Sequence, residues 1–253
     1  MNKKSDINIR FLEDSLLINN EILVFSDVHI GFEEHIIESG ALPDMQITEI
    51  LERIERIFTN LEKNKIKIKE IVIVGDLKHE FGGISDKEWR ETTRFLDYLE
   101  KKIQKKGKII LVRGNHDNIL GPIAKKKDVK LVDFYNKSGI CFIHGNKLYK
   151  NCFENSKTII LGHLHPSITL SDEYKREKFK CFLLGKWKNK QVIVLPSFSP
   201  ISFGYDLNNF SYVDEKNKGF FIINEKKLKD FEVIIYNNHE NLEYNFGKLK
   251  KLI

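Results

Sequence analysis

The sequence has few cysteines, no long apolar run and no low-complexity segment, and each of these features excludes a class of protein. Its three cysteines, Cys141, Cys152 and Cys181, form no CxxC pair. They suggest neither a disulfide framework nor a thiolate zinc site, and we expect all three to be reduced and buried. No apolar run approaches the ~20 residues that cross a bilayer, and no apolar signal segment follows the basic start MNKKSDINIR. We expect a cytoplasmic protein that does not enter a membrane.

The composition is that of a folded globular protein. Hydrophobic residues make up 41% and charged residues 31% of the 253 residues, so extensive disorder is not expected. No repeat and no compelling linker interrupts the chain, which favours one domain over residues 1–253, with a basic tail at residues 248–253 that frays. A net charge of +6 favours acidic partners such as nucleic acid, but lysine interleaved with glutamate is more typical of solvated faces. Charge alone therefore assigns no partner.

Strand and helix signals alternate in the first half of the sequence. A hairpin is expected near the N-terminus, with Asn19 and Asn20 in one of its turns. An amphipathic helix follows, then the buried strand EIVIV, a helix capped by Ser85 with Glu88 reciprocating, and the strand KIILV. Parallel strands joined by helices place their carboxyl ends on one edge of a sheet. Polar residues at those ends are therefore expected to meet.

Strand signals dominate the second half of the sequence. They lie at residues 129–135, 139–145, 158–166, 179–187, 191–197, 219–224 and 232–236. Helical periodicity is scarce between them, which indicates a second sheet packed on the first. We therefore expect an α/β fold, a two-sheet β-sandwich flanked by helices.

Five of the expected strands end in polar side chains of the same few types. These are Asp27 and His29, Asp76 and His79, Asn115, His116 and Asp117, His144, and His163 and His165. Neutral imidazole and carboxylate or amide oxygens are the ligands of a hard or borderline divalent cation. A single DxH or HxH is also compatible with a hydrogen-bonded turn or a core histidine. Six of the eight histidines lie at these ends, however, and that grouping favours a metal site.

The ordered motifs DxH, GDxxH, GNHD, H and GHxH resemble those of the calcineurin-like metallophosphoesterase superfamily. The resemblance implies an αββα fold and two divalent ions. One ion would be held by Asp27, His29, Asp76 and His165, and the other by Asp76, Asn115, His144 and His163. Asp76 would bridge the ions, His116 would stabilise or protonate the departing oxygen, and Asp117 would orient its ring. Two ions ~3.5–4 Å apart activate a water for in-line attack on phosphorus.

The motif GDLKH ends in His79, whereas GDxxD is the frequent pattern in this superfamily. In this respect the motif resembles that of SbcD-type repair nucleases. The matching histidine there is thought to position the phosphate, and the alternative is that it only orients its loop. HIGFEEHIIESGALPDMQ and LPSFSP are similar to a small archaeal and bacterial group related to SbcD, often encoded near repair helicases or ligases. That likeness implies a manganese-dependent DNA nuclease or phosphodiesterase in DNA repair, with a helicase or ligase as partner and a homodimer as assembly.

The chain after His165 is too short for both the DNA-capping domain and the partner-binding helices of SbcD-type enzymes. A minimal nuclease acting on single strands or flaps is the resulting expectation. The ligand types also accept iron, zinc or nickel in place of manganese. A phosphodiesterase of cyclic or small nucleotides is the main alternative. A protein phosphatase would carry GDxVDRG, which is missing, and a pure binding scaffold would have lost ligands that this sequence retains.

Basic residues near the motifs or in the GKWKNK turn are candidate DNA contacts. They are Arg113, Lys147, Lys150, Lys186, Lys188 and Lys190, of which Arg113 and the three lysines of the turn are the main candidates. Ordinary solvated lysine is an equally good interpretation of the turn, and Trp187 within it either stacks on a base or, more commonly for a hairpin aromatic, packs on its neighbours. LPSFSP is interpreted as a turn or as a loop over the site, and Glu33 and Glu34 as a solvated helix start.

Overall fold

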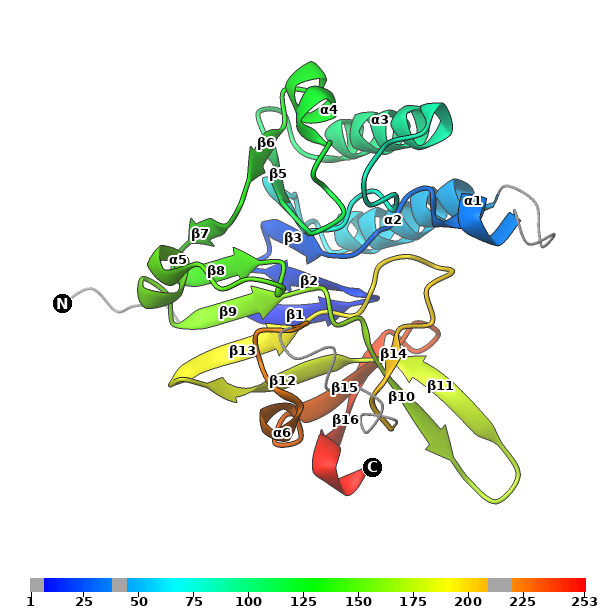
Figure 1. The fold of residues 1–253 in the computed structure, drawn as a ribbon, viewed down its shortest axis with the longest axis vertical. Coiled ribbons are helices and arrows are strands. Elements are labelled where there is room, and N and C mark those ends of the chain that lie inside the picture. The colour runs from blue at the N-terminus through cyan, green and yellow to red at the C-terminus, as the bar shows by residue number, and fades with distance from the viewer. Residues whose placement is uncertain (1–6, 38–44, 209–219) are drawn as a thin grey trace.

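The computed structural model describes residues 7–37, 45–208 and 220–253 and has four layers. Figure 1 shows helices above and below a pair of stacked sheets. The upper layer contains α1 (Phe32–Ile37), α2 (Gln46–Lys63), α3 (Asp86–Lys102) and α4 (Gly121–Lys126), while α6 (Glu225–Leu228) lies below the sheets and α5 (Lys150–Glu154) lies at the left beside β8. The predicted two-sheet sandwich flanked by helices is therefore confirmed.

The first sheet has six strands in the order β1-β2-β3-β4-β5-β6. Their bounds are β1 Ile9–Leu12, β2 Ser15–Ile18, β3 Ile22–Phe25, β4 Glu70–Val74, β5 Lys108–Val112 and β6 Lys130–Val132. Asn19 and Asn20 join β2 to β3 with φ of 52° and 57°, the left-handed conformation that a tight hairpin turn requires. Strands β3 to β6 are parallel, so the residues that follow β3, β4 and β5 share one edge, as predicted.

The second sheet has seven strands in the order β16-β15-β12-β13-β9-β8-β7. Their bounds are β7 Tyr135–Lys137, β8 Ile140–Ile143, β9 Thr158–Leu161, β12 Phe182–Trp187, β13 Lys190–Val194, β15 Glu232–Asn237 and β16 Leu242–Lys248. The prediction of a strand at residues 219–224 is wrong over the described residues 220–224, because residues 220–223 are bends, and the carbonyl of Phe220 instead contacts His163. Strand β16 was not predicted, since its side chains are mostly exposed on both faces.

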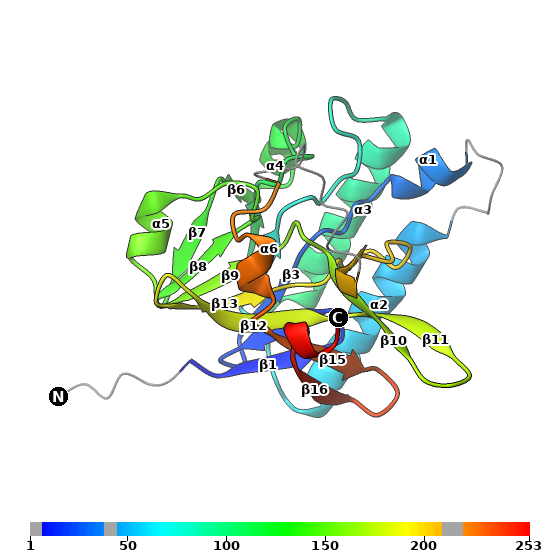
Figure 2. The same cartoon turned by 60° about the horizontal axis from the view of Figure 1, so that its bottom comes forward.

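A third, three-stranded sheet continues directly from the last polar motif. It contains β11 (Arg176–Lys180), β10 (Pro166–Ser171) and β14 (Tyr205–Asp206) in that order. The β10–β11 hairpin projects from the sandwich in both views (Figures 1 and 2). Sequence patterning merged β11 with β12, because only the buried Cys181 separates the two strands.

Three apolar clusters hold the layers together. Val24, Val72 and Ile110 of the first sheet meet Phe142 and Ile160 of the second between the sheets. The outer face of the first sheet packs on α2 and α3, and that of the second on α5, α6 and neighbouring loops. The apolar stripe of α2 is buried, as the sequence predicted.

The N-cap of α3 differs in part from the prediction. Ser85 Oγ accepts a hydrogen bond from the backbone N–H of Glu88, as expected. Glu88 does not reciprocate; its Oε1 accepts from the N–H groups of His79 (2.7 Å) and Glu80 (2.9 Å). The first turn of α3 thereby holds the end of the GDLKH loop in place.

The expectation of three reduced cysteines is wrong for two of them. Cys141 on β8 and Cys152 on α5 form a disulfide with a Cα–Cα distance of 5.4 Å, because α5 packs over β8. Their separation of 11 residues gave no CxxC signal. Cys181 is free and buried.

The C-terminal tail is packed, contrary to the expectation that it frays. Residues Leu249–Lys251 form a 3-10 helix, and the buried Leu249 donates its backbone N–H to the carbonyl of Phe231. Among the described helices, none combines the length and the apolar character needed to cross a membrane.

Candidate metal centre

The polar motifs converge through left-handed backbone conformations just beyond the strand ends. Asp27, His29, Asp76, His163 and His165 have φ between 48° and 66°. Such values are uncommon for residues other than glycine and carry strain that the surrounding structure must offset. The DxH and HxH motifs therefore do not continue the extended geometry of their strands, although their side chains converge.

The first group of side chains consists of Asp27, His29 and His165, whose potential ligand atoms all lie within 4.8 Å of one another. His165 Nε2 is 3.1 Å from Asp27 Oδ1 and 3.3 Å from His29 Nε2. Asp27 is fully buried, while His165 retains some exposure. The carboxylate of Asp76 also reaches this group, 3.8 Å from His29 Nε2.

The second group consists of Asp76, His144 and His163. His144 Nε2 lies 3.2 Å from Asp76 Oδ2 and 3.0 Å from His163 Nδ1. The amide oxygen of Asn115 is 3.0 Å from the same His144 nitrogen. Asp76 thus contacts both groups, and the two sets predicted from the resemblance are brought together around it.

The imidazole hydrogen bonds test whether cations fit here. His144 Nδ1 contacts the carbonyl of Val74 (3.1 Å), and His163 Nε2 contacts that of Phe220 (2.8 Å). A carbonyl only accepts, so each of these nitrogens carries a proton. In the neutral rings the other two nitrogens, His144 Nε2 and His163 Nδ1, carry lone pairs, and these nitrogens face each other. Lone pairs 3.0 Å apart beside buried carboxylates are satisfied by a cation, and metal-bound histidines characteristically use such outer hydrogen bonds. The residues fit divalent metal ions.

Electrostatics also favour positive charge at this centre. Burial alone would lower the pKa of His144, but the carboxylates of Asp76 and Asp27 raise it to about 9. Burial and the neighbouring His144 lower the pKa of His163 to about 4, and burial with His165 lowers that of His29 to about 3. The two carboxylates therefore draw a proton onto His144 while His29 and His163 stay neutral, and cations would replace that proton.

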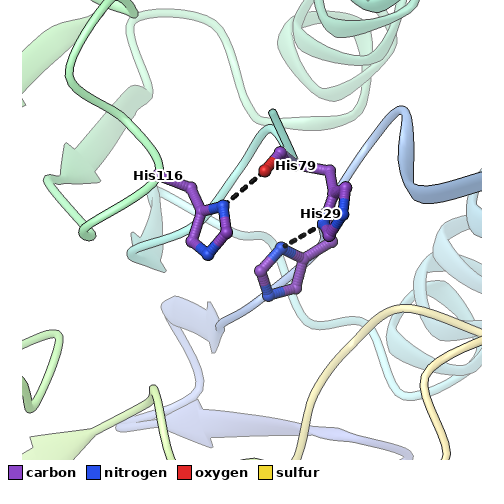
Figure 3. Close-up of side chains that lie close together, drawn as sticks. All are labelled: His29, His79 and His116. Atoms are coloured by element: carbon purple, nitrogen blue, oxygen red, sulfur yellow. Dashed lines mark hydrogen bonds between the residues drawn. The ribbon is translucent and has the colours of Figure 1, made fainter. Parts of the chain in front are cut away.

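His116 lies beside the centre with His79 and His29, as Figure 3 shows. Its backbone N–H donates to Asp76 Oδ1 (2.9 Å), and its ring Nδ1 points to the carbonyl of His79. His79 Nδ1 in turn lies 3.3 Å from His29 Nδ1, and the His79 and His116 rings stack with centroids 5.5 Å apart. His79, a candidate catalytic residue from the sequence, therefore contacts both His29 of the DxH motif and His116 of the GNHD motif.

Asp117 does not contact the His116 ring as the resemblance implied. Its Oδ2 accepts from the N–H of Gly114 (2.9 Å), and its Oδ1 accepts from that of Leu77 (3.1 Å). Burial, together with the nearby Asp76 carboxylate, raises the pKa of Asp117 to about 6. The orienting contact on His116 comes instead from the His79 carbonyl, and Asp117 acts on it indirectly by joining the GDLKH and GNHD loops.

Two supporting residues were missed or misread in the sequence. Gln46 donates from Nε2 to the carbonyl of His29 (2.8 Å) and accepts from the N–H of Gly31 (3.1 Å). Glu33 is buried rather than solvated, because its carboxylate accepts from the N–H groups of Met45 (2.7 Å) and Gln46 (2.8 Å) at the start of α2. Both residues fall within the segment that carried the subgroup likeness, which was the available signal.

The LPSFSP segment lies behind the first group of ligands. Ser197 Oγ donates to the carbonyl of Asp27 (2.7 Å), and the fully buried Phe198 ring stacks on Phe25 with centroids 4.6 Å apart. Arg53, on α2, donates a hydrogen bond to the carbonyl of Phe198 (2.9 Å), and Lys180, on β11, donates one to the carbonyl of Ser197 (2.8 Å). These bonds make LPSFSP a support for the strained Asp27 backbone.

The predicted DNA contacts are not all at the centre. Arg113 follows β5 and donates to the Asp117 carbonyl (3.3 Å) and to Asp133 (3.3 Å), so it lies at the edge of the site. The hairpin that carries Lys186, Lys188 and Lys190 lies at the amino end of β13, which pairs in parallel with β9. The histidines follow the carboxyl end of β9, so at least about 10 Å of strand separates them from the hairpin.

Trp187 of the same hairpin packs on protein neighbours. Its ring meets Phe153 edge to face at 5.6 Å, and Lys188 Nζ lies 4.6 Å above it. Lys190 Nζ donates to the carbonyls of Ser156 and, at 3.3 Å, Glu154. The packing interpretation of Trp187 is confirmed.

For a nucleic-acid substrate, replacing Lys186, Lys188 and Lys190 together by glutamine is expected to leave cleavage and its salt dependence unchanged within about twofold, because lysines remote from a strand at the centre release no counterions there. Arg113→Gln, at the edge of the centre, is the comparison and is expected to weaken binding. Rates of cleavage of a labelled oligonucleotide across a salt series would measure both. A flatter salt slope for the triple variant would show that these lysines do contact the substrate.

The αββα fold and the centre shared by Asp76 define a metal-dependent phosphoesterase. The chain belongs to the calcineurin-like phosphoesterase family, because the family model of that description matches residues 21–243. Members of this family are hydrolases that use divalent metals, in agreement with the ligand groups described above.

The chain is similar to solved structures at low sequence identity, and the first of these shares its fold. The crystal structure of the nuclease MPE from Pseudomonas putida is 19% identical, with a TM-score of 0.58, and the match covers 90% of this chain and 96% of that one. A Vps29 variant from Entamoeba histolytica is 15% identical, with a TM-score of 0.36, covering 89% of this chain and 99% of that one. A comparison with curated proteins finds no match.

Proposed function

We propose that this phosphoesterase is a manganese-dependent DNA nuclease of the SbcD-related type, acting in DNA repair. The observation that carries the proposal is the pair of ligand groups around Asp76 with His116 and His79 beside them. GDLKH places an imidazole where many relatives have a carboxylate, and that ring stacks on His116. The fold shared with a protein described as a nuclease supports the same substrate class.

The ligand groups supply places for two divalent ions. The first set is Asp27, His29, Asp76 and His165, and the second is Asp76, Asn115, His144 and His163. When bound, two such ions lower the pKa of a water and neutralise charge on the phosphoryl oxygens. We propose manganese because the ligands are a mixture of imidazole, carboxylate and amide oxygen, a set that it accepts along with iron, zinc or nickel.

His116 is proposed to handle the proton of the departing oxygen. The His79 carbonyl fixes a proton on Nδ1, so Nε2 is the nitrogen that can carry a second proton and give it up. Nε2 lies 4.0 Å from Asp76 Oδ2, and the side chain is 23% exposed, so a substrate can reach it. His79 is proposed to position the phosphate from the same side.

His116→Ala is expected to reduce cleavage of an oligonucleotide by about 10²–10⁴-fold, the usual contribution of a positioned general acid. Turnover of bis(p-nitrophenyl) phosphate should fall by less, because p-nitrophenolate leaves without needing a proton. Steady-state rates on both substrates give the comparison, and metal content measures whether the centre is intact. Equal losses on the two substrates would overturn the proton role.

A panel of substrates tests the nuclease proposal itself. End-labelled single-stranded, double-stranded and flapped DNA would be incubated with Mn²⁺ beside a cyclic dinucleotide, using the wild-type chain and His116→Ala. We expect cleavage of single strands or flaps that His116→Ala loses. The cavity over the centre has a volume of about 430 Å³, a size that also suits a small ligand. Turnover of the dinucleotide with intact DNA would therefore establish a small-nucleotide phosphodiesterase instead.

The remaining elements of the proposal stay predictions. A single domain over the whole chain and a cytoplasmic location are inferred from the sequence pattern, and a homodimer and a repair helicase or ligase as partner are inferred from the resemblance. Size-exclusion chromatography with light scattering would test the dimer.

A further inference from the structure

Three of the most exposed large apolar side chains of the described residues surround the metal centre. Phe81 is 59% exposed, Phe203 is 77% exposed and Phe220 is 46% exposed. They come from three separate loops, after β4, after β13 and before α6. Solvation of so much aromatic surface is unfavourable, and exposed apolar side chains gathered at one place mark an interaction site.

The rings lie on different sides of the centre. Phe81 meets the His116 ring edge to face with centroids 5.4 Å apart, on the side of GDLKH and GNHD. Phe220 covers His163 with centroids 4.3 Å apart, on the side of GHLH. Phe203 lines the cavity of about 430 Å³ together with Asp76, His116 and His163. A phosphate at Asp76 would therefore have aromatic neighbours in more than one direction.

We infer that Phe81, Phe203 and Phe220 form an aromatic rim that stacks on unpaired bases flanking the phosphate at the centre. This inference rests on the proposed function, because it takes the ligand to be a nucleic-acid strand. Every base has a π-face, and phenylalanine offers no polar atom, so the rim binds bases without reading their sequence. Bases inside a duplex are already stacked on each other and cannot occupy it. The rim thus selects single-stranded nucleotides.

The position of the rim favours this occupant over a protein partner. Phe203 and Phe220 line a cavity that also contains Asp76, His116 and His163, and Phe81 contacts the His116 ring, so the rings lie beside the metal-binding side chains. Phe220 also has a structural role, because its backbone carbonyl accepts a hydrogen bond from His163 Nε2. Within the described part of the chain, Phe203 and Phe81 make no such hydrogen bond to a side chain of the centre, which makes them the informative positions to change.

The test compares bases with backbone. Fluorescein-labelled single-stranded oligothymidylate and an abasic oligomer of equal length carry the same phosphates, so the ratio of their Kd values isolates the bases. Phe203→Ala and Phe81→Ala are each expected to weaken oligothymidylate binding by about 5–100-fold, while binding of the abasic oligomer stays the same. Phe203→Tyr should restore binding. Phe246→Ala, which removes an exposed phenylalanine from the distant β16, is the matched control and should change neither Kd.

Binding would be measured by anisotropy in EDTA, and cleavage of the same oligomers with Mn²⁺ in parallel. Equal Kd values for the two oligomers in the wild-type chain, or equal losses on both in the alanine variants, would overturn the stacking role. Cleavage that persists in that case would leave the nuclease proposal standing. Base-dependent binding with no cleavage of any oligonucleotide would support the rim and contradict the nuclease proposal.

Discussion

Asp76→Asn is expected to abolish phosphodiester hydrolysis, with a loss of at least about a thousandfold on every substrate. Asp76 contacts both ligand groups through Oδ2, which lies 3.2 Å from His144 Nε2 and 3.8 Å from His29 Nε2. An asparagine has the same shape and can still accept the N–H of His116 through its Oδ1, so the fold should persist. The change removes the negative charge that two cations would share.

Rates on bis(p-nitrophenyl) phosphate and on labelled DNA would measure this effect, with metal content per chain determined by mass spectrometry. We expect fewer bound ions as well as lost activity. Asp133→Asn is the matched control, because Asp133 is 60% exposed and pairs with Arg113 outside the ligand groups. An Asp76→Asn variant that binds two ions and keeps even a tenth of wild-type activity would refute the bridging role.

Gly114→Ala is expected to inactivate the protein through sterics alone. A Cβ at this position would lie 2.1 Å from Asp76 Oδ1 and 2.4 Å from the Asp76 backbone nitrogen, far inside van der Waals contact. The carboxylate must move, and with it the contacts to both ligand groups. Overpacking of a buried site costs about 1–3 kcal/mol, so we expect a lower Tm together with a loss of activity close to that of Asp76→Asn.

Gly121→Ala provides the matched control for the same substitution. A Cβ at Gly121 would have no heavy atom within 4 Å, and this residue begins α4. Alanine is the better helix former, so stability should be unchanged or slightly higher and activity intact. Thermal unfolding followed by circular dichroism, with activity on the same samples, separates the two variants. A Gly114→Ala variant with the Tm and the activity of the wild-type chain would show that the GNHD loop does not pack tightly against Asp76.

The sequence predicted the position of the centre because of a simple property of parallel sheets. Asp27, Asp76 and Asn115 follow β3, β4 and β5, whose carboxyl ends lie on one edge whatever the details of the loops. His144 and His163 follow β8 and β9 in the facing sheet in the same way. Polar residues after apolar strands were therefore sufficient to group them.

The sequence could not give the features that depend on strand direction or on contacts between distant segments. The basic hairpin of Lys186 and Lys190 appeared to be near the motifs, but β12 runs antiparallel to β13 and turns at the opposite edge. Periodicity likewise does not encode the pairing of Cys141 with Cys152 across β8 and α5. The burial of Glu33 depends on the distant start of α2, which its local sequence does not reveal.

Titration of the metal-free chain with Mn²⁺ tests the central claim most directly. Bound ions per chain and turnover of bis(p-nitrophenyl) phosphate would be measured on the same samples. The two ligand groups that share Asp76 predict saturation at two ions per chain, with activity appearing as the second ion binds. Saturation at one ion or fewer, or full activity in a chain freed of metal, would contradict a dinuclear phosphoesterase.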